Sequence, residues 1–196
     1  MAEKMTQQER SHRTRQGVLD LAAEEFATVG YQAANLKVVA RRLGVTTGAL
    51  YGHFPSKEAL AEALTRQAAS DWAEMCARAE ADGGGDPRQV LRAATGALMR
   101  RLAEPRFRAA LRLAADARPD AGEEGADLLE RMHGHLLHEL HRAERSGRLT
   151  PPWRPESAAQ VLFALVCGAT FGGRAAGEVG RWPEVARTVL DVICGP

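Results

Sequence analysis

Four histidines lie within one nine-residue segment and could ligate a metal ion: His133, His135, His138 and His141. Imidazole nitrogens are common ligands of zinc. On a helix with 100° per residue, only His133 lies beside the apolar face, whereas the other three spread over the opposite face. The spacing therefore favours solvated histidines over a zinc site. His133 points toward the interior, where it could line a pocket or make a hydrogen bond in the core.

The sequence shows no catalytic pattern around these histidines. It contains no P-loop, CxxC pair or HExxH motif, and no nucleophile is placed near them. Cys76, Cys167 and Cys194 are far apart, which is typical of free thiols in a reducing cytoplasm. The longest apolar run, residues 161–172, is too short to span a bilayer. We therefore expect a cytoplasmic protein without enzymatic activity, cofactor, metal site or membrane partner.

Residues 35–54 combine the signals of two short helices joined by a tight turn. Asn35 is a helix N-cap, and apolar residues recur on one face of residues 36–43. Gly44 can adopt a positive φ and end that helix, after which Thr46 caps the next one. A glycine turn between two helices is typical of the helix-turn-helix motif, whose second helix enters the major groove of DNA.

The second of these helices has one face without bulky side chains. Leu50 and Phe54 fall close together at 100° per residue and face the core, whereas Gly48, Ala49 and Gly52 lie opposite them. Small residues let a backbone approach DNA closely. A glycine turn also occurs in other helical hairpins, so the spacing alone leaves an ordinary structural role open.

Polar side chains flank this bare face. Tyr51 and His53 could reach phosphates, and Thr47 could reach a base edge or a thymine methyl group. Lys57 begins the following helix, where its ammonium could bind one more phosphate. Tyr51 could instead cover the core.

The whole chain predicts an all-α protein of about nine helices. Helical spacing of apolar residues recurs throughout, and no segment alternates as a strand would. We expect a helix-turn-helix DNA-binding domain of three helices at 1–55 and a ligand-binding and dimerisation domain at 56–196. The net charge is only +1, but basic residues cluster at 10–15 and 37–57. The clearest expected helices are 8–28, 36–43, 47–54, 123–146, 157–176 and 183–194.

The last two expected helices are apolar on most sides. They carry small residues such as Ala158 and Gly168 and larger ones such as Val161 and Val189. Helices of this kind must be buried, either in the core of a monomer or between two protomers. We favour a homodimer with a four-helix bundle at its interface, because two-fold symmetry matches a palindromic operator.

Residues 13–60 resemble the DNA-binding domain of the tetracycline-repressor (TetR) family. The match runs from Arg-Thr-Arg-Gln through Phe-Ala-Thr-Val-Gly-Tyr to Leu-Gly-Val-Thr-Thr-Gly-Ala-Leu-Tyr-Gly-His-Phe-Pro-Ser-Lys-Glu-Ala-Leu. The resemblance implies an all-helical homodimer whose divergent C-terminal half binds a small molecule. By position it assigns DNA contact to Thr46, Thr47, Gly48, Tyr51, His53 and Lys57, to which we add the basic Lys37.

Two positions depart from the family pattern. Many members have lysine where this chain has Thr47, and a bulky aromatic residue where it has Gly52. Both departures remove reach toward DNA, so the operator sequence of a relative does not carry over. They keep open a second interpretation, a small-molecule or metal-sensing protein of the same fold with weak or lost DNA binding.

An effector cavity between helices should be apolar with few polar groups. The chain also resembles the γ-butyrolactone-receptor branch of the family, through residues 13–16 and 48–51 and the general run of its C-terminal half. That branch typically has a tryptophan in the helix that contains Met132 and His133, and this chain has none there. The effector therefore stays open. The candidate lining residues, each of which could instead be plain core, are Trp72, Met75, Leu98, Phe107, Leu111, Met132, His133, Leu136, Phe163 and Phe171.

These patterns together predict a ligand-responsive transcriptional regulator. In the default mechanism, a dimer occludes a promoter by placing two recognition helices about one DNA turn apart. An unknown small molecule that binds better to a form with a different spacing would release the DNA. Repression is the expected direction.

Overall fold

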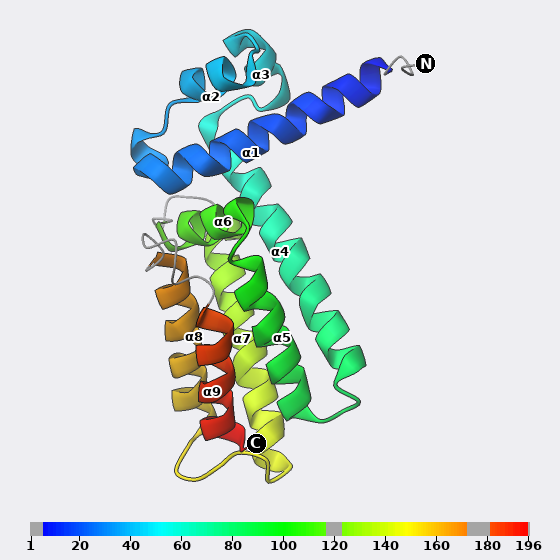
Figure 1. The fold of residues 1–196 in the computed structure, drawn as a ribbon, viewed down its shortest axis with the longest axis vertical. Helices are drawn as coiled ribbons and strands as arrows, with labels where there is room; N and C mark the ends of the chain where they lie inside the picture. The colour runs from blue at the N-terminus through cyan, green and yellow to red at the C-terminus, as the bar shows by residue number, and fades with distance from the viewer. Residues whose placement is uncertain (1–5, 117–122, 172–180, 196) are drawn as a thin grey trace.

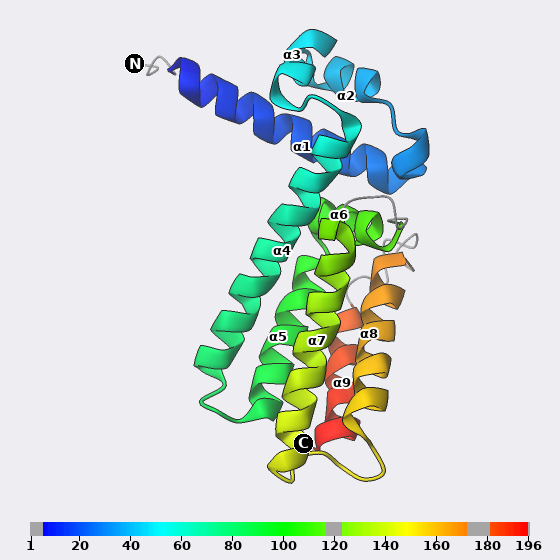
Figure 2. The same ribbon diagram turned by 180° about the vertical axis from the view of Figure 1, so that it is seen from behind.

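The computed structural model describes residues 6–116, 123–171 and 181–195. These residues form nine α-helices and no strand, which confirms the all-α prediction. Figures 1 and 2 show α1–α3 stacked on one end of a bundle that is built from the other helices. The helices are α1 (Gln7–Ala33), α2 (Leu36–Leu43), α3 (Thr47–His53), α4 (Lys57–Asp82), α5 (Pro87–Arg101), α6 (Pro105–Asp116), α7 (Glu123–Arg145), α8 (Pro155–Phe171) and α9 (Trp182–Cys194).

The helices begin where the sequence places good capping residues. Thr6 and Glu9 form a reciprocal capping box at the start of α1. The Ser56 hydroxyl accepts a hydrogen bond from an amide in the first turn of α4. Asp86 caps α5, with Pro87 at its first position. Each cap satisfies amides that have no partner inside their own helix, so these boundaries follow from local sequence.

The first helix is longer than its predicted range of 8–28. Gly30 interrupts α1 with a φ of 80° and a ψ of 165°, after which the chain regains a helical turn that ends at Ala33. Residues with a side chain rarely adopt a positive φ, so the glycine permits this break two residues after the predicted end of the helix. The turn that follows Gly30 was not predicted.

The apolar core is continuous between the helix-turn-helix and the bundle. Leu50 in α3, Leu60 in α4 and Leu98 in α5 are fully buried members of one cluster of core side chains. A second cluster, which includes Leu136 and Leu190, joins α7 to α8 and α9. Over the residues that the structure describes, none of the helices is long and apolar enough to cross a membrane.

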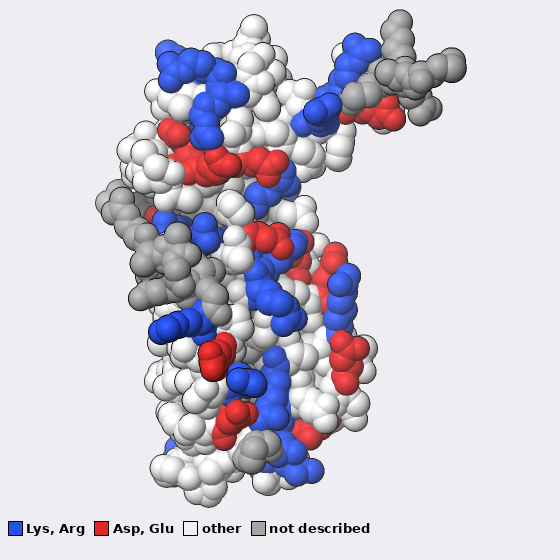
Figure 3. Space-filling model, in the orientation of Figure 1, with Lys and Arg blue, Asp and Glu red and all other residues white. Residues whose placement is uncertain are grey.

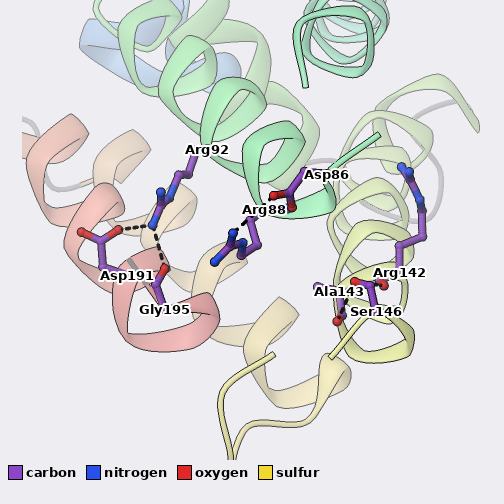
Figure 4. A network of polar contacts seen from close by, with 8 residues as sticks. All are labelled: Asp86, Arg88, Arg92, Arg142, Ala143, Ser146, Asp191 and Gly195. Atoms are coloured by element: carbon purple, nitrogen blue, oxygen red, sulfur yellow. Dashed lines mark hydrogen bonds and ion pairs between the residues drawn. The ribbon is translucent and has the colours of Figure 1, made fainter. Parts of the chain in front are cut away.

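Arginine contacts close the end of the bundle that lies far from α1–α3. Arg92 in α5 donates hydrogen bonds to Asp191 Oδ1 at 2.6 Å and to the Gly195 carbonyl oxygen at 2.7 Å (Figure 4). Arg142 in α7 contacts both carboxylate oxygens of the buried Glu139, at 3.0 and 2.8 Å. A buried carboxylate needs such a partner to offset its lost hydration. The two Arg92 contacts fix the C-terminal end of α9 against α5.

Candidate nucleic-acid interface

A glycine turn joins α2 to α3. The Asn35 side chain accepts a hydrogen bond from the Lys37 amide at 3.0 Å and so caps α2. Gly44 ends α2 in the left-handed conformation, with a φ of 74° and a ψ of 27°. The Thr46 hydroxyl then accepts a hydrogen bond from the Ala49 amide at 3.1 Å and caps α3. The predicted caps and the predicted turn are confirmed.

The orientation of α3 leaves one of its faces bare. Leu50 and Phe54 are buried, with 0% and 2% of their surface exposed. On the outer side, a Cβ atom added to Gly52 would meet no atom within 4 Å, and one added to Gly48 would meet only the Thr46 hydroxyl, at 3.9 Å. The Tyr51 side chain is 45% exposed beside them. A surface of this shape allows close approach to the α3 backbone, as the sequence predicted.

Close packing against α1 holds the helix-turn-helix in place. A Cβ atom on Gly17 would lie only 2.7 Å from Leu43 Cδ1, so the glycine lets α2 approach α1 closely. At the C-terminal end of α3, the guanidinium of Arg15 lies 4.8 Å from the centre of the Phe54 ring, within the range of a cation–π contact. The first contact holds α2 against α1, and the second holds the C-terminal end of α3 against α1.

The ammonium of Lys57 faces the end of α1. Its Nζ donates hydrogen bonds to the carbonyl oxygens of Tyr31 at 2.8 Å, Gln32 at 3.1 Å and Ala34 at 3.4 Å. It also lies 4.6 Å from the centre of the Tyr31 ring. Lys57 therefore ties the start of α4 to the connection between α1 and α2. A phosphate contact from this ammonium stays a prediction and would require it to leave these oxygens.

Tyr31 strengthens the same junction. Its hydroxyl donates a hydrogen bond to Glu58 Oε1 at 3.0 Å. Burial and the contact with this carboxylate raise the pKa of Tyr31 to about 12, so the hydroxyl stays protonated at neutral pH. The same hydrogen bond helps to lower the pKa of Glu58, after the backbone amide and the Ser56 hydroxyl, which contribute more. No local signal in the sequence indicates this junction, because its partners lie 26 to 27 residues apart.

The predicted DNA-contact residues other than Lys57 lie along α2 and α3. Thr46, Gly48 and Lys37 are exposed, and Thr47 and His53 are half-buried. Arg41 was not among the predicted DNA-contact residues. It is exposed one helical turn after Lys37 and so shares its face of α2. Figure 3 shows Lys and Arg side chains over α2 and on the projecting end of α1, with acidic side chains below them.

Two arginines in α6 connect the DNA-binding helices to the bundle. Arg106 donates hydrogen bonds from its guanidinium to Asp20 Oδ1 and, at 2.7 Å each, to the side-chain and backbone oxygens of Gln16 in α1. Arg112 donates to the Ala27 carbonyl oxygen in α1 at 2.9 Å and to the Thr170 carbonyl oxygen in α8 at 3.2 Å. Helix α6 therefore contacts α1 at two points that are seven to eleven residues apart, or about two to three helical turns.

The predicted effector residues do not share one environment. His133 and Phe163 are half-buried and pair edge to face between α7 and α8, with ring centres 5.6 Å apart. Met75 is also half-buried, and Phe171, 46% exposed, lies beside Arg112. The others are buried core side chains, divided between two clusters: Trp72, Leu98, Phe107, Leu111 and Met132 in one, and Leu136 in the other. Their role in ligand binding stays a prediction.

The prediction that His135 is solvated is wrong. Its ring lies edge to face with Trp72 of α4, with centres 5.6 Å apart, and its Nε2 atom is shielded from solvent without a hydrogen-bond partner. Burial lowers the pKa of His135, although Glu139 and Glu80 act in the opposite direction. The error arose because α7 is packed against helices on more than one side, α4 among them. Within the described residues, no group of three or more side chains could hold a metal ion.

Comparison with known proteins places these features in one family. Residues 18–64 match the family described as bacterial regulatory proteins, tetR family. The A-factor receptor protein of Streptomyces griseus is 45% identical over 60 residues, which are 31% of this chain but only 22% of that protein. The solved structure of the TetR family protein CprB from S. coelicolor A3(2) has a TM-score of 0.75 at 27% identity, covering 92% of this chain and 88% of that one.

A gamma-butyrolactone receptor described as an ArpA-like protein shares the fold. Its TM-score is 0.70 at 24% identity, with 92% of this chain and 97% of that chain covered. The match to residues 18–64 contains α2 and α3 entirely, including the glycine turn and the bare face of α3. Residues 18–64 therefore form a domain of the tetR family of bacterial regulatory proteins, and the described residues share the fold of a solved TetR family protein.

Proposed function

We propose that this protein is a ligand-responsive transcriptional repressor that binds operator DNA as a homodimer and is released by a small molecule. The observation that carries the proposal is the outer face of α3, where Gly48 and Gly52 leave the backbone open beside the exposed Tyr51. This face belongs to a domain that matches the TetR family. DNA binding would explain why the face is exposed, whereas packing of the core would not.

Each side chain around this face has a role that follows from its chemistry. Thr47 would contact a base edge or a thymine methyl group, whereas Tyr51 and His53 would contact phosphates. The Thr46 oxygen accepts the Ala49 amide, which leaves its hydroxyl proton available for a phosphate oxygen. Lys37 adds an exposed positive charge at the start of α2. Gly48 would let the backbone of α3 come close to the DNA.

The homodimer would form through α8 and α9. Among the described residues, Phe171 in α8 and Val185 and Val192 in α9 are three of the five large apolar side chains with exposed surface. Val185 and Val192 are seven residues apart and therefore share one face of α9. Pairing this face with a second copy would bury apolar surface and supply the two-fold symmetry that a palindromic operator needs.

The effector would act through the bundle of α4–α9. The names of two relatives, an A-factor receptor and a gamma-butyrolactone receptor, support a small-molecule signal for this chain as well. The γ-butyrolactone-receptor branch typically has a tryptophan in the helix that corresponds to α7. In this chain a tryptophan contacts α7 from another helix, because Trp72 of α4 packs against His135. A small, mostly apolar molecule that separates these helices would shift α6 and, through Arg106 and Arg112, the position of α1.

DNA binding is tested by titrating labelled DNA from the upstream intergenic region against a scrambled duplex, at several salt concentrations. We expect specific binding that weakens with salt. Tyr51→Phe removes one hydroxyl and should weaken binding to all sequences to a similar extent. Tyr31→Phe is the matched control, because its hydroxyl bonds to Glu58 inside the domain. Absence of specific binding at low salt would contradict the repressor and favour a sensor of the same fold without DNA recognition.

Dimer formation is tested separately by light scattering after size-exclusion chromatography. Val192→Arg places a charge at the proposed interface and should yield monomers. Val29→Arg provides the matched control, because Val29 is an exposed valine on α1, outside the proposed interface, and its change should leave the dimer intact. A dimer that survives Val192→Arg and Val185→Arg together would place the interface elsewhere.

A further inference from the structure

The buried side chains of the bundle fall into two separate apolar clusters. The proximal cluster continues into the helix-turn-helix, and the distal cluster joins α5 and α7 to α8 and α9 at the far end of the bundle. The boundary lies between Met132 and Leu136 in α7, between Leu162 and Val166 in α8, and between Ala186 and Leu190 in α9. These three helices run side by side (Figures 1 and 2), so the buried apolar core is interrupted at one level of the bundle.

Thr95 lies at this boundary in α5. It is one turn from Leu91, which belongs to the distal cluster, and one turn from Leu98, which belongs to the proximal cluster. Residues three and four positions apart share one face of a helix, so Thr95 lies on the same face as both leucines. Only 2% of its surface is exposed, yet within the described residues its hydroxyl has no hydrogen-bond partner.

A second polar atom without a partner lies at the same level. His135 is located between Met132 and Leu136 in α7, and its Nε2 atom is shielded from solvent without a hydrogen bond. A buried polar atom without a hydrogen bond destabilises a protein, and such atoms are rare in native structures. Two other buried threonines, Thr65 and Thr170, donate to carbonyl oxygens of their own helices. Helix packing alone therefore does not explain the polar atoms at the boundary.

We propose that the Thr95 hydroxyl binds the effector, and that the effector is an uncharged molecule with a hydroxyl or carbonyl group between two apolar parts. The inference rests on the proposed ligand-responsive function and names the chemical class of the ligand. A threonine hydroxyl can donate to a carbonyl oxygen and can also accept from a hydroxyl group. The apolar parts would pack on the proximal and distal clusters, on either side of the polar group. The bound molecule would thereby join the clusters and favour a different packing of the helices around them.

The charges near this level disfavour an anionic effector. An ionised group in the interior needs a charged partner to offset its lost hydration. Burial lowers the pKa of His135, which favours the neutral imidazole, and the carboxylates that act on this ring are Glu139 and Glu80. Glu139 is already paired with Arg142 at 2.8 Å. A ligand carboxylate would therefore lose its hydration and approach like charges.

Three ligands with similar carbon skeletons test the proposed class: dibutyl ketone, methyl heptyl ketone and nonanoate. Each is titrated against the full chain, and binding is measured as the rise in melting temperature. Dibutyl ketone, whose carbonyl group lies at its centre, should raise the melting temperature most, and nonanoate should raise it least. Dibutyl ketone should also release the labelled upstream DNA at a lower concentration than the other two ligands.

Thr95→Val and its control Thr65→Val separate ligand contact from a structural role. Valine replaces the hydroxyl with a methyl group. Because the Thr95 hydroxyl has no partner, Thr95→Val should raise the melting temperature of the free protein and remove the preference for dibutyl ketone. Thr65 donates to the carbonyl oxygens of Ala61 and Glu62, so Thr65→Val should not raise the melting temperature and should keep the preference.

The outcomes distinguish this inference from the proposed function. The inference is overturned if dibutyl ketone shifts the wild type and Thr95→Val equally, if it shifts neither, or if nonanoate shifts the wild type more. A lower melting temperature of free Thr95→Val would also contradict it, because the hydroxyl would then stabilise the fold. Specific DNA binding by the wild type in these cases leaves the proposed repressor standing with another kind of effector. A wild type that binds no specific DNA at low salt contradicts the proposed function, whereas a response to dibutyl ketone that depends on Thr95 still supports the ligand contact.

Discussion

Arg112 in α6 donates a hydrogen bond to the carbonyl oxygen of Ala27 in α1 at 2.9 Å. The same guanidinium donates to the Thr170 carbonyl oxygen near the C-terminal end of α8 at 3.2 Å and lies 5.9 Å from the centre of the Phe171 ring. One side chain thus joins the helix that supports the helix-turn-helix to a helix of the proposed dimer interface. A change in the bundle that moves α6 reaches α1 through this contact.

Arg112→Ala should lower the free energy of unfolding by about 1–3 kcal/mol, because two carbonyl oxygens lose a charged donor. Urea denaturation measures the loss, and hydrogen exchange should quicken at amides in the last turns of α1. Arg100→Ala is the control, since Arg100 is exposed on α5 and its change should stay within about 0.5 kcal/mol. Equal stability of the two variants would show that Arg112 does not hold α1 to α8.

Lys57→Ala should also destabilise the protein by about 1–3 kcal/mol, because three carbonyl oxygens at the end of α1 lose their shared donor. Lys37→Ala is the comparison, because this exposed lysine should affect DNA affinity and leave stability nearly unchanged. Thermal melting and DNA titration on both variants separate the two roles. A Lys57→Ala variant with weaker DNA binding and wild-type stability would restore the sequence-based role of Lys57 as a phosphate ligand.

Gly52→Ala should raise the stability by about 0.5–1 kcal/mol, because alanine favours a helix and its Cβ would enter open space. The same variant should bind DNA less well if the bare face of α3 touches the duplex. Gly44→Ala should instead lower the stability by about 1–2 kcal/mol, since Gly44 has a φ of 74°, which alanine rarely adopts. Chemical denaturation of both variants checks the signs, and a destabilising Gly52→Ala would contradict the open face.

Acidification should destabilise the protein through His135. Burial lowers the pKa of this side chain below its ordinary value of 6.5 in the folded state. As the pH falls through 6.5, the unfolded chain takes up the proton first, so the stability present at higher pH is lost. Urea midpoints between about pH 7.5 and 5.5 should fall less for His135→Phe, which keeps a ring against Trp72, than for the wild type.

The control for this pH dependence is His12→Phe, because His12 is exposed on α1 and is not among the groups that act on His135. It should keep the pH dependence of the wild type. Identical pH profiles for His135→Phe and the wild type would show that the half-buried imidazole makes no difference to stability between these pH values.

The helix-turn-helix follows from local features of the sequence. Asn35, Gly44 and Thr46 act on amides and carbonyls within a few residues, and Leu50 and Phe54 are separated by one helical turn. Capping and periodicity are local properties, so the pattern predicts both the boundaries of the helices and the face of α3 that stays bare. The break at α1 and the cap of α5 were predictable for the same reason.

The contacts of Lys57, His135 and Arg112 depend on how the helices pack against one another. The partners of Arg112 lie 58 and 85 residues away in sequence, and those of Lys57 lie 23 to 26 residues away. Helical periodicity shows which residues of one helix share a face, but it contains no information on which other helix covers that face. His135 lies on the polar side of its own helix, and the packing of α4 with Trp72 against that side leaves it half-buried.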